Sequence, residues 1–207
     1  MLSVFPYPKL KEFKIFRKLN TPAKIQDFLD KIPINFEKQG NTIRSPLFVL
    51  RKNQAHCIEG AILAAAILWY HHEKPLLLDI GTTEEDLDHV VALFKRKNYW
   101  GAISKTNHAV LRYRDPVYKN VRELAMSYFN EYFLDNRKKS MRNYSVPLDL
   151  RQLGQDWLVS EKNQWSVERA LNNVKHFNVL KPGMAKWLRL ADKFEAKADS
   201  ITEWPKK

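Results

Sequence analysis

The spacing of apolar residues predicts two helices in the first seventy positions. Thr21 and Pro22 begin the first helix, because threonine favours the N-cap and proline the first helical turn. Its apolar residues recur at helical spacing: Ile25, Phe28, Leu29 and Ile32. Residues 57–70, CIEGAILAAAILWY, are apolar on every face, which is typical of a helix buried on most sides. The segment 35–54 between them is polar and mixed, so we expect it to be irregular.

Short apolar runs then predict strands. They cover residues 75–80, 89–95, 99–104 and 108–114, and the basic sequence KRKN between the second and third indicates a hairpin. Helical segments are expected over 117–135, 163–180 and 184–199, with an irregular stretch at 145–154. Strands grouped apart from helices are typical of the α+β class, and 207 residues suit one domain, 1–207.

The amino-acid composition indicates the class of protein and the cellular compartment in which we expect it. Hydrophobic residues make up 44% of the chain, as in folded globular proteins. The longest apolar run, residues 61–70, is too short to cross a bilayer, and the N-terminal sequence lacks a signal-peptide pattern. A single cysteine forms no internal disulfide, so we expect a reducing compartment, the cytoplasm.

The net charge of the chain indicates which binding partners it favours. The chain has 35 Lys and Arg against 23 Asp and Glu, and its net charge of +12 favours anionic or acidic partners. The basic residues are dispersed along the sequence, and no nucleic-acid-binding motif accompanies them. Nucleic acid is therefore a weaker expectation than an acidic substrate or protein.

The only cysteine, Cys57, stands at the start of the buried helix. Unsatisfied N–H groups and the positive end of the helix dipole favour a thiolate there, and cysteines so placed have pKa values of about 3.5–7.5. A thiolate attacks carbonyl groups, and a nearby imidazole completes its activation. Cys57 is therefore a candidate nucleophile, with a small helix-starting residue as the structural alternative.

Among six histidines, His89 is the best candidate base, because it opens an apolar strand after the acidic stretch 84–88. A strand histidine bound to backbone groups is the alternative. His56 adjoins Cys57, so on a helix its side chain is expected to diverge from the thiol. His71 and His72 lie at the other end of the helix, where they suit its negative dipole end.

The order of Cys-led helix, short strand, His-led strand and Trp-containing strand resembles the core of the transglutaminase-like superfamily. This superfamily includes transglutaminases, cysteine peptidases and amidases. The residues that carry the resemblance are AHCIEGAILAAAILWYHHEKPLLLDI, DHVVALFKRKNYW and WGAISK, within about residues 50–105. The resemblance implies Cys57 as the nucleophile and His89 as the base. It also implies a papain-like α+β fold in which the cysteine helix packs on an antiparallel sheet. Extra N- and C-terminal helices, a catalytic core of about 45–118 and a helical part of about 119–207 are expected.

The third catalytic residue departs from the family pattern. Members usually place an aspartate four residues after the strand tryptophan, and here that position is Ser104. A serine holds an imidazole but does not stabilise imidazolium as an anion does. Asn107 is the first choice, because it can orient the ring as asparagine does in papain-like enzymes, and Ser104 is the second.

An oxyanion site needs donors aimed at the developing charge. The Cys57 backbone N–H is one candidate and the Gln54 amide another, with helix capping or exposure to solvent as the alternative for Gln54. Trp100 either walls the site or belongs to the core. The aromatic-rich segments 126–136 and 155–165 have the pattern of core, and together with the C-terminal helices they are expected to cover the cleft.

The function expected from this sequence is a cysteine-dependent hydrolase or acyltransferase. It would act through a thioester on an amide or peptide-type bond of a peptide, protein or small amide. No zinc-ligand pattern and no glycine-rich phosphate loop occur, so neither a metal nor a cofactor is expected. The alternative is a catalytically inactive basic module on the same fold that recognises an acidic protein or nucleic acid.

Overall fold

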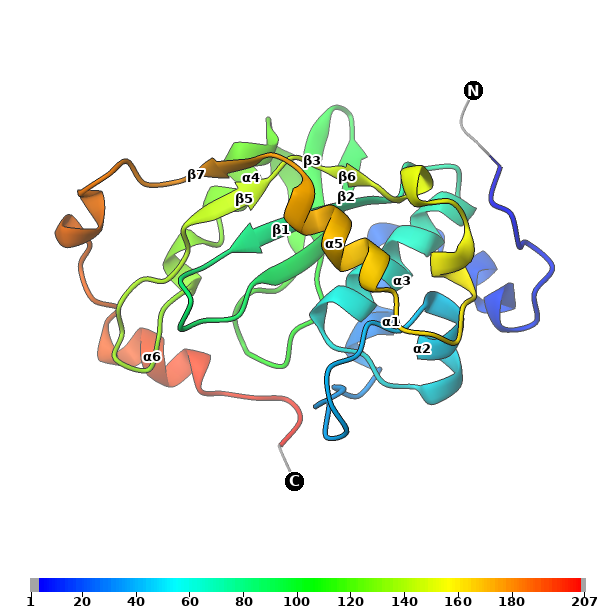
Figure 1. Cartoon of the computed structure of the whole chain (residues 1–207), viewed down its shortest axis with the longest axis horizontal. Coiled ribbons are helices and arrows are strands. Elements are labelled where there is room, and N and C mark those ends of the chain that lie inside the picture. Colours follow the sequence, from blue (N-terminus) through cyan, green and yellow to red (C-terminus); the bar gives the residue numbers. More distant parts are fainter. Residues whose placement is uncertain (1–3, 206–207) are drawn as a thin grey trace.

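A seven-stranded antiparallel sheet organises the computed structural model, which describes residues 4–205 (Figure 1). The strands run in the spatial order β4-β3-β2-β1-β5-β7, and β6 also pairs with β1. Their bounds are β1 Leu76–Gly81, β2 His89–Arg96, β3 Tyr99–Ile103, β4 Arg114–Tyr118, β5 Asn143–Ser145, β6 Leu148–Asp149 and β7 His176–Asn178. The chain is thus of the α+β class.

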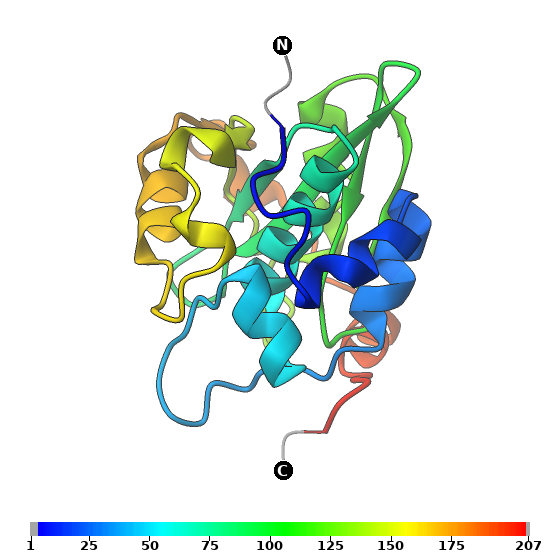
Figure 2. The ribbon, with the colours of Figure 1, turned by 90° about the vertical axis from the view of Figure 1, so that its right-hand side faces the viewer.

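Helices surround this sheet. The α-helices are α1 Pro22–Asp30, α2 Pro46–Lys52, α3 Cys57–Tyr70, α4 Val121–Met126, α5 Trp165–Asn173 and α6 Lys193–Asp199. Short 3-10 helices cover Glu12–Lys18 (η1), Phe129–Glu131 (η2), Leu150–Leu153 (η3), Asp156–Leu158 (η4) and Met184–Trp187 (η5). Figures 1 and 2 together place α3 between the N-terminal helices and the sheet, with α6 at the far end from η1. No helix in the described part of the chain has both the length and the hydropathy to span a bilayer.

Both faces of the central strands are buried. Along β2, Val90 and Ala92 belong to the core cluster that contains α3, whereas Val91 and Leu93 belong to the cluster on the opposite face. This alternation follows from the two-residue period of a strand. Because helices and loops cover both faces, β2 carries a continuous apolar run instead of an alternating one.

The first turn of α3 is pressed against the segment that follows β3. A Cβ atom on Gly60 would lie 2.4 Å from the Cβ of Lys105, so only glycine allows this approach. Lys105 is itself buried, and its Nζ donates to the carbonyls of Leu29 (2.9 Å) in the last turn of α1 and of Ile32 (2.5 Å) just after it. These contacts fix the end of β3 beside the start of α3.

The strongest periodic signals in the sequence are confirmed. The helix expected after Thr21 is α1, with Thr21 Oγ1 accepting from the Lys24 N–H as its N-cap, and the apolar helix is α3, Cys57–Tyr70. The first three predicted strands are β1, β2 and β3. Strands β2 and β3 form the predicted hairpin.

Other expectations are wrong. The fourth strand lies at Arg114–Tyr118 and not at 108–114; it tolerates Pro116 because β4 is at the edge of the sheet. Helix α2 begins at Pro46 in the segment expected to be irregular, with Ser45 as its N-cap. The part after residue 119 is not uniformly helical, since β5, β6 and β7 extend the central sheet. The helices expected over 117–135, 163–180 and 184–199 are correspondingly shorter.

Candidate active site

The predicted thiol and imidazole are brought together by α3 and β2. Cys57 is the first residue of α3 and His89 the first of β2, and β2 packs against α3. Both residues line a cavity of about 290 Å³, and the imidazole of His89 interacts with the thiol of Cys57. Cys57 is partly exposed, while His89 is buried. A ligand in the cavity therefore reaches the sulfur with the imidazole beside it.

The hydrogen bonds of His89 define its tautomer. Its Nε2 lies 2.8 Å from Ser104 Oγ, and that hydroxyl donates its one proton to the carbonyl of Leu111 at 2.5 Å. Ser104 Oγ must therefore accept from Nε2–H. The other ring nitrogen, Nδ1, is left to exchange a proton with the thiol, as a general base requires.

Ser104 is held in place from a distant part of the sequence. Gln26 on α1 accepts from the Ser104 N–H (2.9 Å) and donates to the Ser104 carbonyl (2.7 Å). The serine side chain directly follows β3 and is almost completely buried. The rigid α1–β3 contact thereby sets the position of the His89 ring.

A second histidine contacts the thiol, contrary to expectation. His56 is the N-cap of α3 with an extended backbone (φ −100°, ψ −171°), so the helical spacing that would turn its side chain away does not apply. Its side chain interacts with the thiol of Cys57, and its Nε2 binds the Thr42 carbonyl at 2.8 Å. Carboxylate oxygens of Glu37 and Glu59 lie 3.4 and 3.6 Å from the same nitrogen.

These contacts favour a thiolate–imidazolium pair. Burial raises the pKa of Cys57, but hydrogen bonds from His56 and His89 outweigh it and lower the pKa to about 5. Burial likewise lowers the pKa of His56, but its bond to Cys57 and the charges of Cys57 and Glu59 raise it to about 9. At neutral pH, Cys57 is therefore the anion and His56 the cation.

Tyr132 is a site residue that the sequence did not single out. It lines the Cys57 cavity from the segment after η2, is 3% exposed, and its hydroxyl has no hydrogen-bond partner among residues 4–205. Burial raises its pKa well above the usual range, so the group remains a neutral phenol. A buried phenol without a partner is available to donate to a ligand oxygen.

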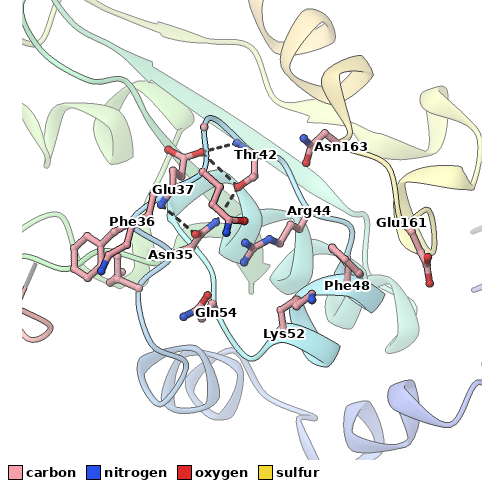
Figure 3. A pocket seen from close by; sticks show the side chains of 14 residues that line it. Asn35, Phe36, Glu37, Thr42, Arg44, Phe48, Lys52, Gln54, Glu161 and Asn163 are labelled. Carbon is pink, nitrogen blue, oxygen red and sulfur yellow. Dashed lines mark hydrogen bonds between the residues drawn. The ribbon is translucent and has the colours of Figure 1, made fainter. Parts of the chain in front are cut away.

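Three predicted site residues have surroundings other than those expected. Asn107 borders the cavity, but its amide donates to the carbonyl of Trp204 and accepts from the Trp204 N–H, both at 2.8 Å, so Ser104 and not Asn107 contacts His89. Gln54 is exposed and lines a separate polar cavity (Figure 3). Trp100 lines a third cavity, with Lys95 Nζ 4.2 Å from its ring centroid.

His56 and Tyr132 are the functional candidates that sequence reasoning missed. The signal for His56 was its position directly before the helix, where a cap residue adopts a non-helical backbone. Tyr132 lies in the aromatic segment expected to cover the cleft, and nothing in that segment distinguished it from the neighbouring aromatic residues.

Within residues 4–205, no group of three or more His, Cys, Asp or Glu side chains is arranged to hold a metal ion. Comparison of the chain with protein-family models and with curated proteins gave no match.

Proposed function

We propose that this chain is a cysteine-dependent acyl-transfer or hydrolytic enzyme that cleaves an amide or peptide-type bond through a thioester. The observation that carries the proposal is the partly exposed thiol of Cys57, which interacts with two imidazoles, one of which is oriented by Ser104. A lone structural cysteine has no need of such an arrangement.

The first half of the reaction forms the thioester. The Cys57 thiolate bonds to the carbonyl carbon of the substrate, and His89 Nδ1 takes up a proton from solvent. His56 stays protonated and stabilises the thiolate electrostatically. The Cys57 N–H, which as part of the first helical turn has no partner within the helix, and the Tyr132 hydroxyl donate to the developing oxyanion. His89 then protonates the leaving nitrogen as the C–N bond breaks.

The second half releases the acyl group. Water or an amine attacks the thioester carbon, and His89 Nδ1, now neutral, takes a proton from the attacking group. The C–S bond breaks and the thiolate returns beside an imidazolium. Throughout, Nε2–H stays on Ser104 Oγ, which keeps Nδ1 directed at the reacting atoms. Serine does this without a negative charge, so it orients the ring and leaves the imidazolium less stabilised than an aspartate would.

The order of elements supports a transglutaminase-like arrangement. The nucleophile begins a buried helix, the base begins the strand packed on it, and the orienting side chain directly follows the next strand. On this proposal the substrate is a peptide, protein or small amide. The reactive thiol would act in a reducing compartment such as the cytoplasm, where it stays reduced.

The test is acylation by p-nitrophenyl acetate followed by mass spectrometry. We expect an acetyl group on Cys57 that forms rapidly and disappears as water hydrolyses the thioester. His89→Gln should slow the hydrolysis more than the formation, because the thiolate attacks without a base. Cys57→Ala should lose both steps. An adduct that forms on Cys57 but never turns over would refute the enzymatic proposal.

The pH dependence of alkylation provides a second measurement. Iodoacetamide should label wild-type Cys57 with a half-maximal rate near pH 5, and His56→Gln should move that midpoint upward. His72→Asn is the matched control, since His72 is an exposed histidine with φ +64°, a conformation that asparagine tolerates. A thiol that titrates like free cysteine would favour a non-enzymatic role.

A further inference from the structure

A polar cavity of about 610 Å³ lies beside the Cys57 cavity and plays no part in the mechanism above (Figure 3). The loop 34–44, the helix α2 and the segment around Glu161 line it. Its volume falls in the range of pockets that hold small ligands or several side chains of a peptide. Gln54, a candidate oxyanion donor in the sequence with capping or exposure to solvent as its alternative, lines this cavity.

The acidic side chains of this cavity already have partners. Glu37 Oε1 accepts from the Thr42 N–H at 2.6 Å, and Glu161 forms an ion pair with Arg51 at 2.8 Å. The buried carboxylate of Glu59 behind the wall accepts four hydrogen bonds, from Asn35 Nδ2, Thr42 Oγ1 and the N–H groups of Arg44 and His56. Its capacity is therefore filled without the guanidinium of Arg44.

The basic side chains, in contrast, keep unused donors: Arg44 forms only a long ion pair with Glu59, and Lys52 forms none within residues 4–205. Arg44 Nε is 3.8 Å from Glu59 Oε1, and Arg44 Nη1 is buried with no hydrogen-bond partner among the described residues. Lys52 is exposed, its Nζ lies 5.3 Å from the Phe48 ring centroid, and it forms no ion pair within residues 4–205. In Figure 3 the Arg44 guanidinium lies near the middle of the labelled side chains, between those of Asn35 and Lys52. A guanidinium N–H group that is buried without a partner is costly, and an oxyanion is a ligand that satisfies it.

The two cavities share a wall. Ile34 lines both of them, and the hydrogen bond from His56 to the Thr42 carbonyl joins the loop of the polar cavity to the residue beside the thiol. Ile34 therefore stands between the two cavities, and a peptide that crosses it would occupy both.

We propose that the polar cavity binds a carboxylate of the substrate, an acidic side chain a few residues from the amide that Cys57 attacks, with Arg44 as the principal contact and Lys52 as the second. This inference rests on the proposed function. A singly charged carboxylate fits better than a doubly charged phosphate, because Glu59 stands next to Arg44, Glu37 lines the same cavity, and both repel additional negative charge.

The test uses two peptides that differ only in charge, acetyl-Glu-Ala-Gln-Ala-Glu-amide and its all-Gln analogue acetyl-Gln-Ala-Gln-Ala-Gln-amide. Binding to the Cys57→Ala protein is followed by NMR shifts of the backbone amides of residues 34–44. We expect the acidic peptide to bind about tenfold more tightly, as one charge-assisted contact provides. Arg44→Met should abolish this difference, and Lys52→Met, at an exposed position that does not threaten folding, should reduce it.

Arg169→Met is the control, because Arg169 is an exposed arginine on α5 outside the cavity. It removes the same charge and should preserve the preference. Equal affinities of the two peptides for the Cys57→Ala protein, or a preference that survives Arg44→Met, would overturn the inference.

A second arm tests the connection to the thiol. The acidic peptide, at saturation, should slow iodoacetamide labelling of wild-type Cys57 several-fold, and the neutral peptide should do so less. An Arg44-dependent preference without protection of Cys57 would overturn the assignment of this cavity to the substrate. Failure of the acylation assay alone would reject the enzyme and leave the carboxylate site standing, so the two proposals fail separately.

Discussion

The thiolate–imidazolium pair predicts a specific dependence of stability on pH. In the folded protein the Cys57 pKa is lowered from 9.0 to about 5, and the His56 pKa is raised from 6.5 to about 9. Lowering the Cys57 pKa stabilises the fold at high pH, and this contribution is lost as the pH falls from 9.0 to about 5. Raising the His56 pKa stabilises the fold at low pH, and this contribution is lost as the pH rises from 6.5 to about 9.

The two contributions combine into a slope followed by a plateau. Between pH 6.5 and 9 the folded and unfolded chains bind the same number of protons at this pair, so stability is constant. Between pH 5 and 6.5 the unfolded chain holds one proton more, so stability rises with pH. One proton corresponds to about 1.4 kcal/mol per pH unit, or about 2 kcal/mol across this window.

The measurement is urea unfolding of the wild type and of Cys57→Ser at a series of pH values, followed by tryptophan fluorescence. The difference in unfolding free energy between the two proteins should grow by about 2 kcal/mol from pH 5 to 6.5 and then stay level. Burial raises the pKa of Asp79 to about 6 despite its bond to His176, but that contribution is common to both proteins and cancels to first order. A difference independent of pH would show that the thiol keeps its proton, and the reasoning about the pair would be wrong.

Three further substitutions test the surroundings of the thiol. Ser104→Ala leaves His89 Nε2–H unpaired, which costs about 1–3 kcal/mol of folding stability. We expect acylation of Cys57 to slow by about 10- to 100-fold and the pH profile of this acylation to shift. Tyr132→Phe should slow acylation by about 10²-fold through loss of an oxyanion donor, while thermal unfolding shows no loss of stability, because the hydroxyl has no partner in the protein. Gly60→Ala should destabilise the fold by about 1–3 kcal/mol through its clash with Lys105 Cβ, against a gain of about 1 kcal/mol in helix propensity. Chemical denaturation measures the net cost. A Lys105→Gly background removes that Cβ and should relieve the clash.

Local patterns predicted the elements that carry the thiol and the base. The apolar helix of Cys57 and the apolar strand of His89 are long, strongly patterned and buried, so their sequences alone define them. Strand β4 and strand β7 are short and lie at the two edges of the sheet, where few apolar side chains are needed, and their sequences carry little signal.

The choice between Ser104 and Asn107 depended on contacts that no local pattern contains. Gln26, 78 residues before Ser104 in the chain, fixes the backbone of Ser104 so that its hydroxyl meets His89. Trp204, 97 residues after Asn107, engages both ends of the Asn107 amide. The role of His56 was missed for a different reason, since one extended residue at the helix cap reversed the direction of its side chain.

The pairing of Asn107 with Trp204 has a consequence for biosynthesis. The loop after Ser104 bonds to the last described part of the chain: Ala109 N–H donates to the Ile201 carbonyl, and Asp199 on α6 completes the wall of the thiol cavity. A growing polypeptide on the ribosome therefore makes its cysteine and both histidines early but lacks this wall until residue 204 has emerged. The pocket is complete only after residue 204 has emerged, so the shorter nascent chain carries the Cys57 thiol before it carries the enclosure around it.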